Sequence, residues 1–384
     1  MISNRPWPKI AQSLQEKYTI VAEIDLLELD SNPQLLYHAL KLAYKECYEP
    51  NDRILIYHYD TDFYCAKGSH GFTISNLMTC LRSLDISVNF CLLLTNHYGI
   101  SNEVKQLSSD DLDMPIFENN YQLLQTTPTP IPININIDKI KKSYICLNGS
   151  KRSHRVLFLS YLKEYQLLNC GILSWHFDSL SKVNKCIDHS NDTRSYNITE
   201  IPRSTIFLTT TPSTRVNDQF YIDPIGQGIF NRHCQFFQNN WKDSAIAGDA
   251  NQNRWDIPAV QQAFLYVSVE TVLQYPYPYL TEKTFRAILH KRPFVMLGAP
   301  GCVAQIKKLG FKTFNSLWSE DYDLIEDPND RIRAVVKIVK EISSLSSDQL
   351  KDLMYSIQHV VEFNYKFYVE EFSGSILNNR LTTI

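Results

Sequence analysis

The first third of the chain alternates short apolar runs with segments in which apolar residues recur at helical spacing. Short apolar runs separated by amphipathic helices are typical of βαβ units around a parallel sheet. We therefore expect strands at residues 19–29, 53–59 and 88–95, and helices at residues 33–47, 71–84 and 102–107.

Prolines break this alternation between residues 123 and 142. Pro128, Pro130 and Pro132 occupy every second position, which predicts a linker. The α/β alternation then resumes, and residues 328–371 have a charged helical pattern. We make no detailed prediction for the polar stretch 179–252. The strands expected in this second part are 144–147, 172–175, 205–209, 263–269, 294–298 and 312–314, and the helices are 152–165, 281–291 and 302–309.

These patterns predict an α/β fold with two Rossmann-like domains and a cleft between them. A chain of 384 residues is long enough for two cores. We expect an N-terminal domain at 1–125, a linker at 126–143 and a C-terminal domain at 144–345. Helices in 346–384 are expected to pack back across the junction onto the N-terminal domain.

The composition narrows the class of protein. Hydrophobic residues make up 44% and charged residues 21%, as in ordinary globular proteins, and the net charge of −3 provides no overall basic field for nucleic acid. The nine cysteines include no C-x-x-C pair, which disfavours a zinc site. No apolar run approaches the length of a membrane span. We expect a cytoplasmic protein without a membrane span.

The segment that carries most chemistry begins at the strand expected at 263–269. Glu270 follows this strand, and Thr281 is a suitable N-cap for the next helix. Glu282 and Lys283 then lie in the first turn, at the carboxyl ends of the strands, where open α/β sheets bind ligands. There a carboxylate can accept hydrogen bonds from ribose hydroxyls, and a lysine can neutralise a diphosphate. The alternative is that Glu282 only complements the helix dipole and Lys283 is solvated.

A second cluster of candidates begins the helix expected at 152–165. Lys151, Arg152, His154 and Arg155 crowd its start, where the helix dipole disfavours cations. This placement indicates that an anion binds there, with a solvated basic face as the alternative. Asn148, at the end of the preceding strand, is a further candidate ligand contact.

The first segment resembles the α-1,3-fucosyltransferases, glycosyltransferase family 10. The resemblance rests on a strand ending in Glu270 and on the later series Tyr279-x-Thr281-Glu282-Lys283, followed by a helix and the run Pro293-Phe294-Val295-Met296-Leu297-Gly298-Ala299. That family has Asn-Ser after the first acid, whereas this chain has Thr-Val, so the sugar stays open. The segment also resembles uncharacterised proteins of tailed cyanobacterial phages.

The second cluster resembles the same family. A strand, a short turn and then Arg155-x-x-Phe158 match the stretch whose arginine contacts the nucleotide diphosphate, with Arg155 as the counterpart. Together the two matches span roughly residues 144–314, and the N-terminal part matches no family that we can name.

The resemblance implies a GT-B glycosyltransferase that inverts the anomeric centre without a metal or a tightly bound cofactor. The C-terminal domain would hold the donor, with a GDP-sugar of the GDP-fucose kind favoured and a UDP-sugar also considered. The acceptor hydroxyl would belong to a glycan or to a modified base in phage DNA. The donor-binding residues implied are Asn148, Arg155, Tyr279, Thr281, Glu282 and Lys283.

The catalytic base is the least specified residue. In the fucosyltransferases a carboxylate of the N-terminal domain deprotonates the acceptor, and Asp60 and Asp62 follow a strand expected in that domain. Glu270 is the third catalytic candidate.

Two other interpretations stay open. Asp60-Thr-Asp62 is also the Asp-x-Asp pattern with which single-domain GT-A enzymes hold a divalent metal. The second open interpretation is a non-catalytic protein that binds carbohydrate or nucleotide, since 22 tyrosines would suit stacking on sugars.

Overall fold

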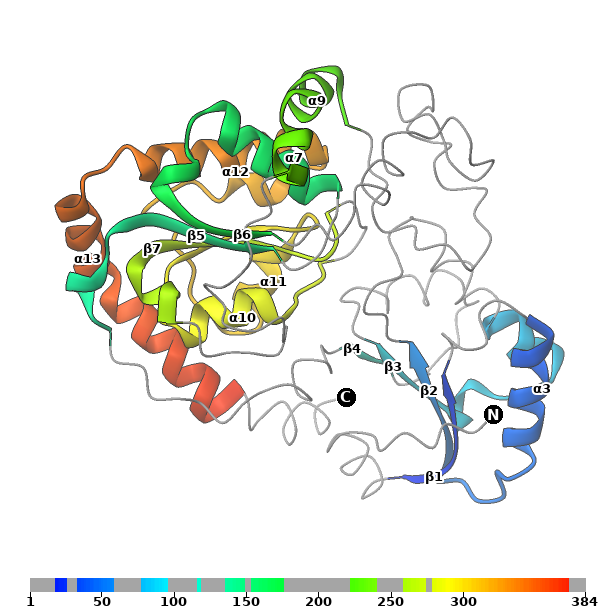
Figure 1. Cartoon of the computed structure of the whole chain (residues 1–384). Coiled ribbons are helices and arrows are strands. Elements are labelled where there is room, and N and C mark those ends of the chain that lie inside the picture. The colour runs from blue at the N-terminus through cyan, green and yellow to red at the C-terminus, as the bar shows by residue number, and fades with distance from the viewer. Residues whose placement is uncertain are drawn as a thin grey trace.

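The computed structural model describes residues 18–25, 33–58, 77–95, 116–118, 135–148, 153–175, 222–239, 258–273 and 278–372. These residues form two parallel β-sheets with helices packed against them (Figure 1). The predicted α/β class is therefore confirmed. Buried apolar side chains form one cluster around each sheet, whereas the cleft and the domain limits stay predictions.

The first sheet contains four parallel strands in sequential order, β1 (Thr19–Asp25), β2 (Asp52–His58), β3 (Cys91–Thr95) and β4 (Ile116–Glu118). Helix α3 (Pro33–Tyr44) connects β1 to β2, and residues 77–83 are helical before β3. The described strands follow one another across the sheet without a reversal of direction.

The second sheet has the strand order β6-β5-β7-β8, and every pair is parallel. From β5 (Lys142–Asn148) the chain adds β6 (Gly171–Trp175) on one side, and then β7 (Ala263–Val269) and β8 (Phe294–Leu297) on the other. The order therefore reverses between β5 and β7. Such a reversal is the point at which open α/β sheets bind ligands, beyond the carboxyl ends of the strands.

Helices cover both faces of the second sheet (Figure 1). Helices α7 (Ser153–Glu164), α9 (Pro224–Asn239) and α12 (Pro328–Ser343) lie on one face, and α10 (Glu282–Leu289), α11 (Cys302–Lys308) and α13 (Ser347–Lys366) lie on the other. Right-handed crossovers that leave in opposite directions place their helices on opposite faces, as α7 after β5 and α10 after β7 do. Short 3-10 helices lie at Val88–Phe90, Ile137–Lys139, Leu168–Cys170, Pro258–Gln262 and Asp321–Leu324, and a π-helix at Phe367–Phe372.

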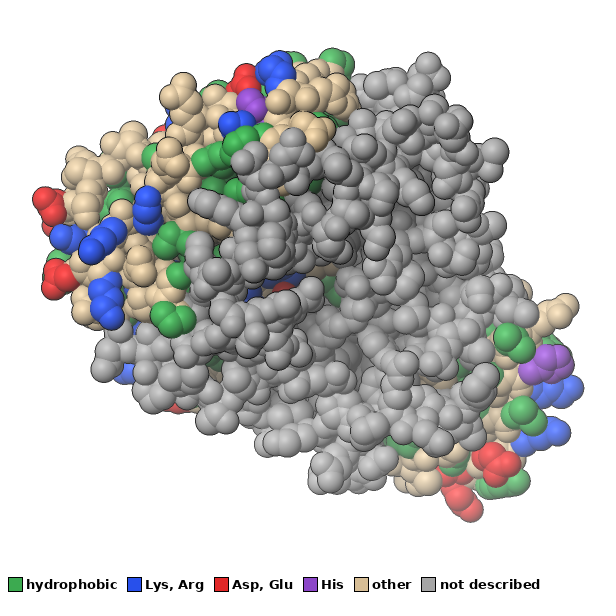
Figure 2. All heavy atoms as spheres, in the orientation of Figure 1, with side chains coloured by type: hydrophobic (Ala, Val, Ile, Leu, Met, Phe, Trp, Pro, Cys, Tyr) green, Lys and Arg blue, Asp and Glu red, His purple; other side chains and the backbone are tan. Residues whose placement is uncertain are grey.

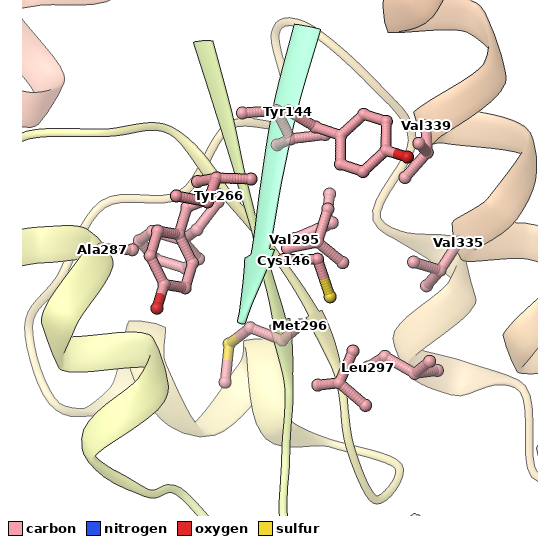
Figure 3. Close-up of a cluster of buried hydrophobic side chains, with 14 of the residues drawn as sticks. Tyr144, Cys146, Tyr266, Ala287, Val295, Met296, Leu297, Val335 and Val339 are labelled. Atoms are coloured by element: carbon pink, nitrogen blue, oxygen red, sulfur yellow. The ribbon is translucent and has the colours of Figure 1, made fainter. Parts of the chain in front are cut away.

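The core explains why the strands of this sheet are so apolar. All seven residues of β7 are buried, as expected for a strand covered on both faces. In Figure 3, Tyr144 lies toward Val339 of α12, while Tyr266 lies toward Ala287 of α10. Tyr144 also requires Gly171 at the start of β6, because a Cβ there would come within 2.3 Å of its ring.

One predicted strand is wrong. Residues 312–314 are not a strand, because side chains rather than a neighbouring strand satisfy their backbone. Asn364 of α13 binds both the N–H and the carbonyl of Lys312 at 2.8 Å, and Glu320 accepts from the N–H of Phe314 at 2.9 Å. Helix α9 falls in the stretch 179–252, for which no helix was predicted.

Other expectations have mixed outcomes. The strand expected at 205–209 and the helix expected at 102–107 lie outside the described residues, as do residues 373–384. Helix α13 packs against α10, β5 and β7, so its predicted return to the first sheet stays a prediction.

No described helix is long and apolar enough to cross a lipid bilayer. Charged side chains of both signs lie around α13 in Figure 2.

Candidate functional site

The site is built where the strand order reverses. Ile145 of β5 pairs with Tyr266 of β7, and the same register continued to the strand ends brings Asn148 level with Val269. Asn148 ends β5 and Glu270 follows β7, while α7 and α10 begin shortly after. The structure thus brings Asn148, Arg155, Glu270 and Lys283 to one edge of the sheet. The candidates Lys151 and Arg152 lie outside the described residues.

Glu270 is fully buried, and both of its carboxyl oxygens accept hydrogen bonds. Thr281 donates to Oε2, and Thr284 and Ser268 donate to Oε1 at 2.6 and 3.3 Å. Burial raises the pKa of this carboxyl, against the opposing effects of Lys283 and the threonine hydroxyls. A carboxylate enclosed in this way favours a positioning role over the direct catalytic contact that the sequence left open.

The space around Glu270 depends on a glycine. A Cβ on Gly298, which follows β8, would lie 3.3 Å from Cβ and Cγ of Glu270 and 3.0 Å from Sγ of Cys302. The backbone of the neighbouring strand therefore approaches the carboxylate closely. Gly298 therefore packs directly against the side chain of Glu270.

Thr281 joins Glu270 to the start of α10. It has extended N-cap geometry, with φ −121° and ψ 179°, and its hydroxyl accepts from the N–H of Lys283 at 3.4 Å. Because the same hydroxyl donates to Glu270, the first turn of α10 is fixed to the end of β7. The predicted N-cap is confirmed.

Glu282 and Lys283 form an ion pair in this first turn, with Oε1 and Nζ 2.9 Å apart. The side chain of Glu282 is 33% exposed and that of Lys283 is 13% exposed. Although burial acts to raise it, the positive charges of Lys283 and Arg286 hold the pKa of Glu282 at about 2. Nζ of Lys283 also donates to the hydroxyls of Thr281 and Thr271 at 3.1 and 3.3 Å. The ammonium is thereby held at the edge of the sheet rather than solvated.

Arg155 and His154 reach the same place from the first turn of α7. Nη2 of Arg155 lies 3.4 Å from the carbonyls of both Val269 and Glu270, and Nε2 of His154 lies 3.1 Å from the carbonyl of Glu270. Burial and the positive charge of Arg155 lower the pKa of Lys283, while Glu282 acts to raise it. Two cations from different helices thus stand close together beside the end of β7.

Asn148 and Tyr279 differ in what they offer. Asn148 is fully buried; Nδ2 donates to Sγ of Cys146 at 3.3 Å, and Oδ1 has no hydrogen-bond partner among the described residues. A buried amide oxygen of this kind can accept a hydrogen bond from a ligand. Tyr279 is also buried, and its carbonyl accepts from Sγ of Cys302 at 3.8 Å.

Sequence reasoning missed Arg331 of α12, which lies far from the site along the chain. Its Nη2 donates to the carbonyl of Leu273 at 2.5 Å, and its Nη1 donates to the carbonyl of Ile325. Arg331 therefore holds the turn that follows Glu270. No local pattern marks it. The hydroxyl partners of Glu270 were detectable, because Ser268 is a polar residue within an otherwise apolar strand.

The candidate bases Asp60 and Asp62 lie outside the described residues. Within the described ranges, no group of three or more His, Cys, Asp or Glu side chains is arranged to hold a metal ion. The metal-dependent alternative depends on Asp60 and Asp62 and so stays open.

Comparisons with protein families, with curated protein sequences and with solved structures each found no match. The resemblance to the fucosyltransferases therefore continues to rest on the two short stretches of this chain alone.

Proposed function

We propose that this protein is a glycosyltransferase that binds a nucleoside-diphosphate sugar at the carboxyl ends of β5 and β7. The observation that carries the proposal is that the positively charged side chains of Lys283 and Arg155 lie together at this edge. They are close enough for the charge of Arg155 to lower the pKa of Lys283. Like charges held together by different helices favour an anion between or beside them. A diphosphate is an anion of suitable charge for such a place.

Each residue then has a separate task. Lys283 neutralises the charge that grows on the diphosphate as the bond to the anomeric carbon breaks. The carboxylate of Glu282, which is ionised at neutral pH and one-third exposed, accepts hydrogen bonds from the ribose hydroxyls. Arg155 positions the end of β7 and adds positive charge. Asn148 supplies a buried acceptor.

The acceptor hydroxyl attacks the anomeric carbon from the opposite side and passes its proton to a carboxylate. Asp60 and Asp62 remain the proposed bases, and the reaction inverts the anomeric centre without a metal. The resemblance favours a GDP-sugar over a UDP-sugar and a glycan over a modified base in phage DNA. A GT-B arrangement, with this acceptor domain facing the donor domain, forms part of the proposal.

Thermal unfolding in the presence of nucleotides tests the proposal. A ligand that binds only the folded protein stabilises it by RT ln(1 + [L]/Kd), so GDP or UDP should raise the melting temperature. The same nucleotide should have little effect on Lys283→Ala. The control variant is Lys337→Ala, because Lys337 lies on α12 with 78% of its side chain exposed.

Adding EDTA and then a nucleotide sugar separates the alternatives. Stabilisation that persists in EDTA, together with release of nucleoside diphosphate when an acceptor is added, supports a metal-independent transferase. Loss of nucleotide binding in EDTA would favour the Asp60-Thr-Asp62 metal site. Binding without any turnover would favour a non-catalytic binding protein, and no melting shift with any nucleoside diphosphate would contradict the donor site itself.

A further inference from the structure

The turn after β7 is held by its carbonyl groups. The carbonyls of Val269 and Glu270 accept from Arg155, and that of Glu270 also accepts from His154. Further along, the carbonyl of Leu273 accepts from Arg331. Three basic side chains from α7 and α12 therefore bind the oxygens of this short segment and fix its peptide planes.

After Glu270, the N–H groups of the same turn have no hydrogen-bond partner among the described residues. The N–H of Glu270 donates to the carbonyl of Leu297 at 2.9 Å, but the next three N–H groups make no hydrogen bond among the described residues. They belong to Thr271, Val272 and Leu273, which are only 7%, 5% and 2% exposed. Backbone N–H groups within buried segments are very rarely unpaired in folded proteins, so three in succession point to an acceptor that does not belong to the described residues.

The direction of the first N–H follows from peptide geometry. In a planar trans peptide the carbonyl of one residue and the N–H of the next point in opposite directions. Because the carbonyl of Glu270 is turned toward His154 and Arg155, the N–H of Thr271 points away from them. The hydroxyl of Thr271 meanwhile lies 3.3 Å from Nζ of Lys283, so the ammonium stands beside this turn.

We propose that the main-chain N–H groups of Thr271, Val272 and Leu273, together with the ammonium of Lys283, bind the phosphate oxygens of a diphosphate. Successive backbone N–H groups form anion-binding concavities elsewhere in proteins. A main-chain N–H is present whatever the side chain of its residue is. Recognition here therefore depends on the orientation of the peptide planes, which Arg155, His154 and Arg331 fix. The inference deepens the proposed function and rests on it for the identity of the complete ligand.

Amide NMR with inorganic pyrophosphate tests this directly. In perdeuterated, ¹⁵N-labelled protein, the amide signals of Thr271, Val272 and Leu273 should move downfield on titration, because each gains a charged acceptor. The conservative variant Val272→Ile assigns the central signal. The amide of Val267, inside β7, should stay in place. Saturable binding that leaves all three turn amides unmoved would overturn the proposal.

A substitution adds a second measurement. Val272→Pro removes one of the three N–H groups and should weaken pyrophosphate binding at least about tenfold, as expected for a lost hydrogen bond to a charged group. Val272→Ala keeps the N–H and should bind as the parent does. If circular dichroism shows that the proline variant is unfolded, the amide titration of the parent protein decides. Equal affinity in a folded proline variant would contradict the proposal.

The two proposals fail differently. If GDP or UDP raises the melting temperature but the turn amides do not respond, the main-chain site is wrong and the nucleotide site stands. If the amides respond to pyrophosphate but no nucleotide sugar is bound or turned over, the main-chain anion site stands and the glycosyltransferase proposal fails.

Discussion

Two helices begin at the same edge of the second sheet, and they differ in which groups accept hydrogen bonds from the free N–H groups of their first turns. Helix α11 follows β8, and the carboxylate of Asp323, from the later 3-10 helix, caps its first turn. Oδ1 accepts from the N–H of Val303 at 2.9 Å and Oδ2 from that of Ala304 at 3.0 Å. The chain thus supplies its own anion at this helix. An additional phosphate there would meet a carboxylate that already holds the donors.

Helix α10 follows β7, and no carboxylate from another described element accepts from the N–H groups of its first turn. The hydroxyl of Thr281 accepts from the N–H of Lys283 at a long 3.4 Å. The carboxylate of Glu282 accepts from its own N–H and is paired with the Lys283 ammonium. Arg155 adds a further positive charge nearby. The two helix starts therefore share a place in the fold and differ in charge.

The difference separates, within one architecture, a helix start that a carboxylate caps from the helix start at which we propose that a ligand binds. A helix N-terminus is ready for an anion wherever it occurs. The residues that arrive from other elements decide whether that anion is a side chain, as with Asp323, or a ligand. Position in the fold alone would not distinguish α10 from α11.

The largest effect is expected from removing the cation at the start of α10. Lys283→Ala should lower kcat about 10²-fold to 10³-fold, because the ammonium contributes most when diphosphate charge develops. Steady-state kinetics with the donor identified by thermal shift would measure it. Lys308→Ala is the matched control, since Lys308 is an exposed lysine of α11. A comparable loss in both variants would remove the distinction between the two helices.

The next effect is on stability and belongs to α11. Asp323→Ala leaves the N–H groups of Val303 and Ala304 without their acceptor and should lower the free energy of unfolding by about 2 kcal/mol. Urea denaturation would measure this, and nucleotide affinity should stay unchanged in the folded variant. Asp321→Ala, in the same 3-10 helix but exposed, should change the free energy of unfolding by less than about 0.5 kcal/mol. Weakened nucleotide binding in Asp323→Ala would indicate that α11 belongs to the site.

Much of this comparison could be predicted from local sequence. The stripe of Phe285, Ile288 and Leu289 and the N-cap Thr281 specify α10, and the unbroken apolar run of β7 specifies a strand buried on both faces. These features depend on periodicity and on a few neighbouring residues. The places of Glu282 and Lys283 follow from them.

What could not be predicted depends on partners distant in sequence. Nothing near residues 312–314 reveals that Asn364 will satisfy the backbone of Lys312, and the short segment Lys312-Thr313-Phe314 was therefore predicted as a strand. Asp323 and Arg331 likewise act on backbone groups that lie about 20 and 58 residues away. Tertiary packing decides which buried polar groups become paired. The sequence therefore predicted the place of the candidate site but not the distant residues that hold its backbone.

A smaller effect is expected at the carboxylate of the α10 ion pair. Glu282→Gln keeps the hydrogen-bonding shape and removes the charge, so it should raise KM for the donor about tenfold. The ribose hydroxyls are neutral in the ground and transition states alike, and kcat should therefore change little. Kinetics on both first-turn variants test whether Glu282 and Lys283 have separate tasks. A fall in kcat as large as that of Lys283→Ala would contradict the assignment.

The smallest effect concerns Glu270, the residue that fixes the start of α10 to β7. Glu270→Gln should fold, because a side-chain amide can replace a carboxyl among the hydroxyls of Ser268, Thr281 and Thr284. The pKa of Glu270 is raised in the folded protein, first of all by burial, so the folded state favours the protonated form. The free energy of unfolding that Glu270 adds relative to Gln is then fully present below its usual pKa of 4.5. It is lost as pH rises through the raised pKa of the folded state. Urea denaturation of both proteins from acid to neutral pH should show this difference falling by at most about 1.4 kcal/mol per pH unit. Unfolding free energies that run parallel over this range would mean that the carboxyl is equally easy to ionise in the folded and unfolded states, and that burial does not raise its pKa.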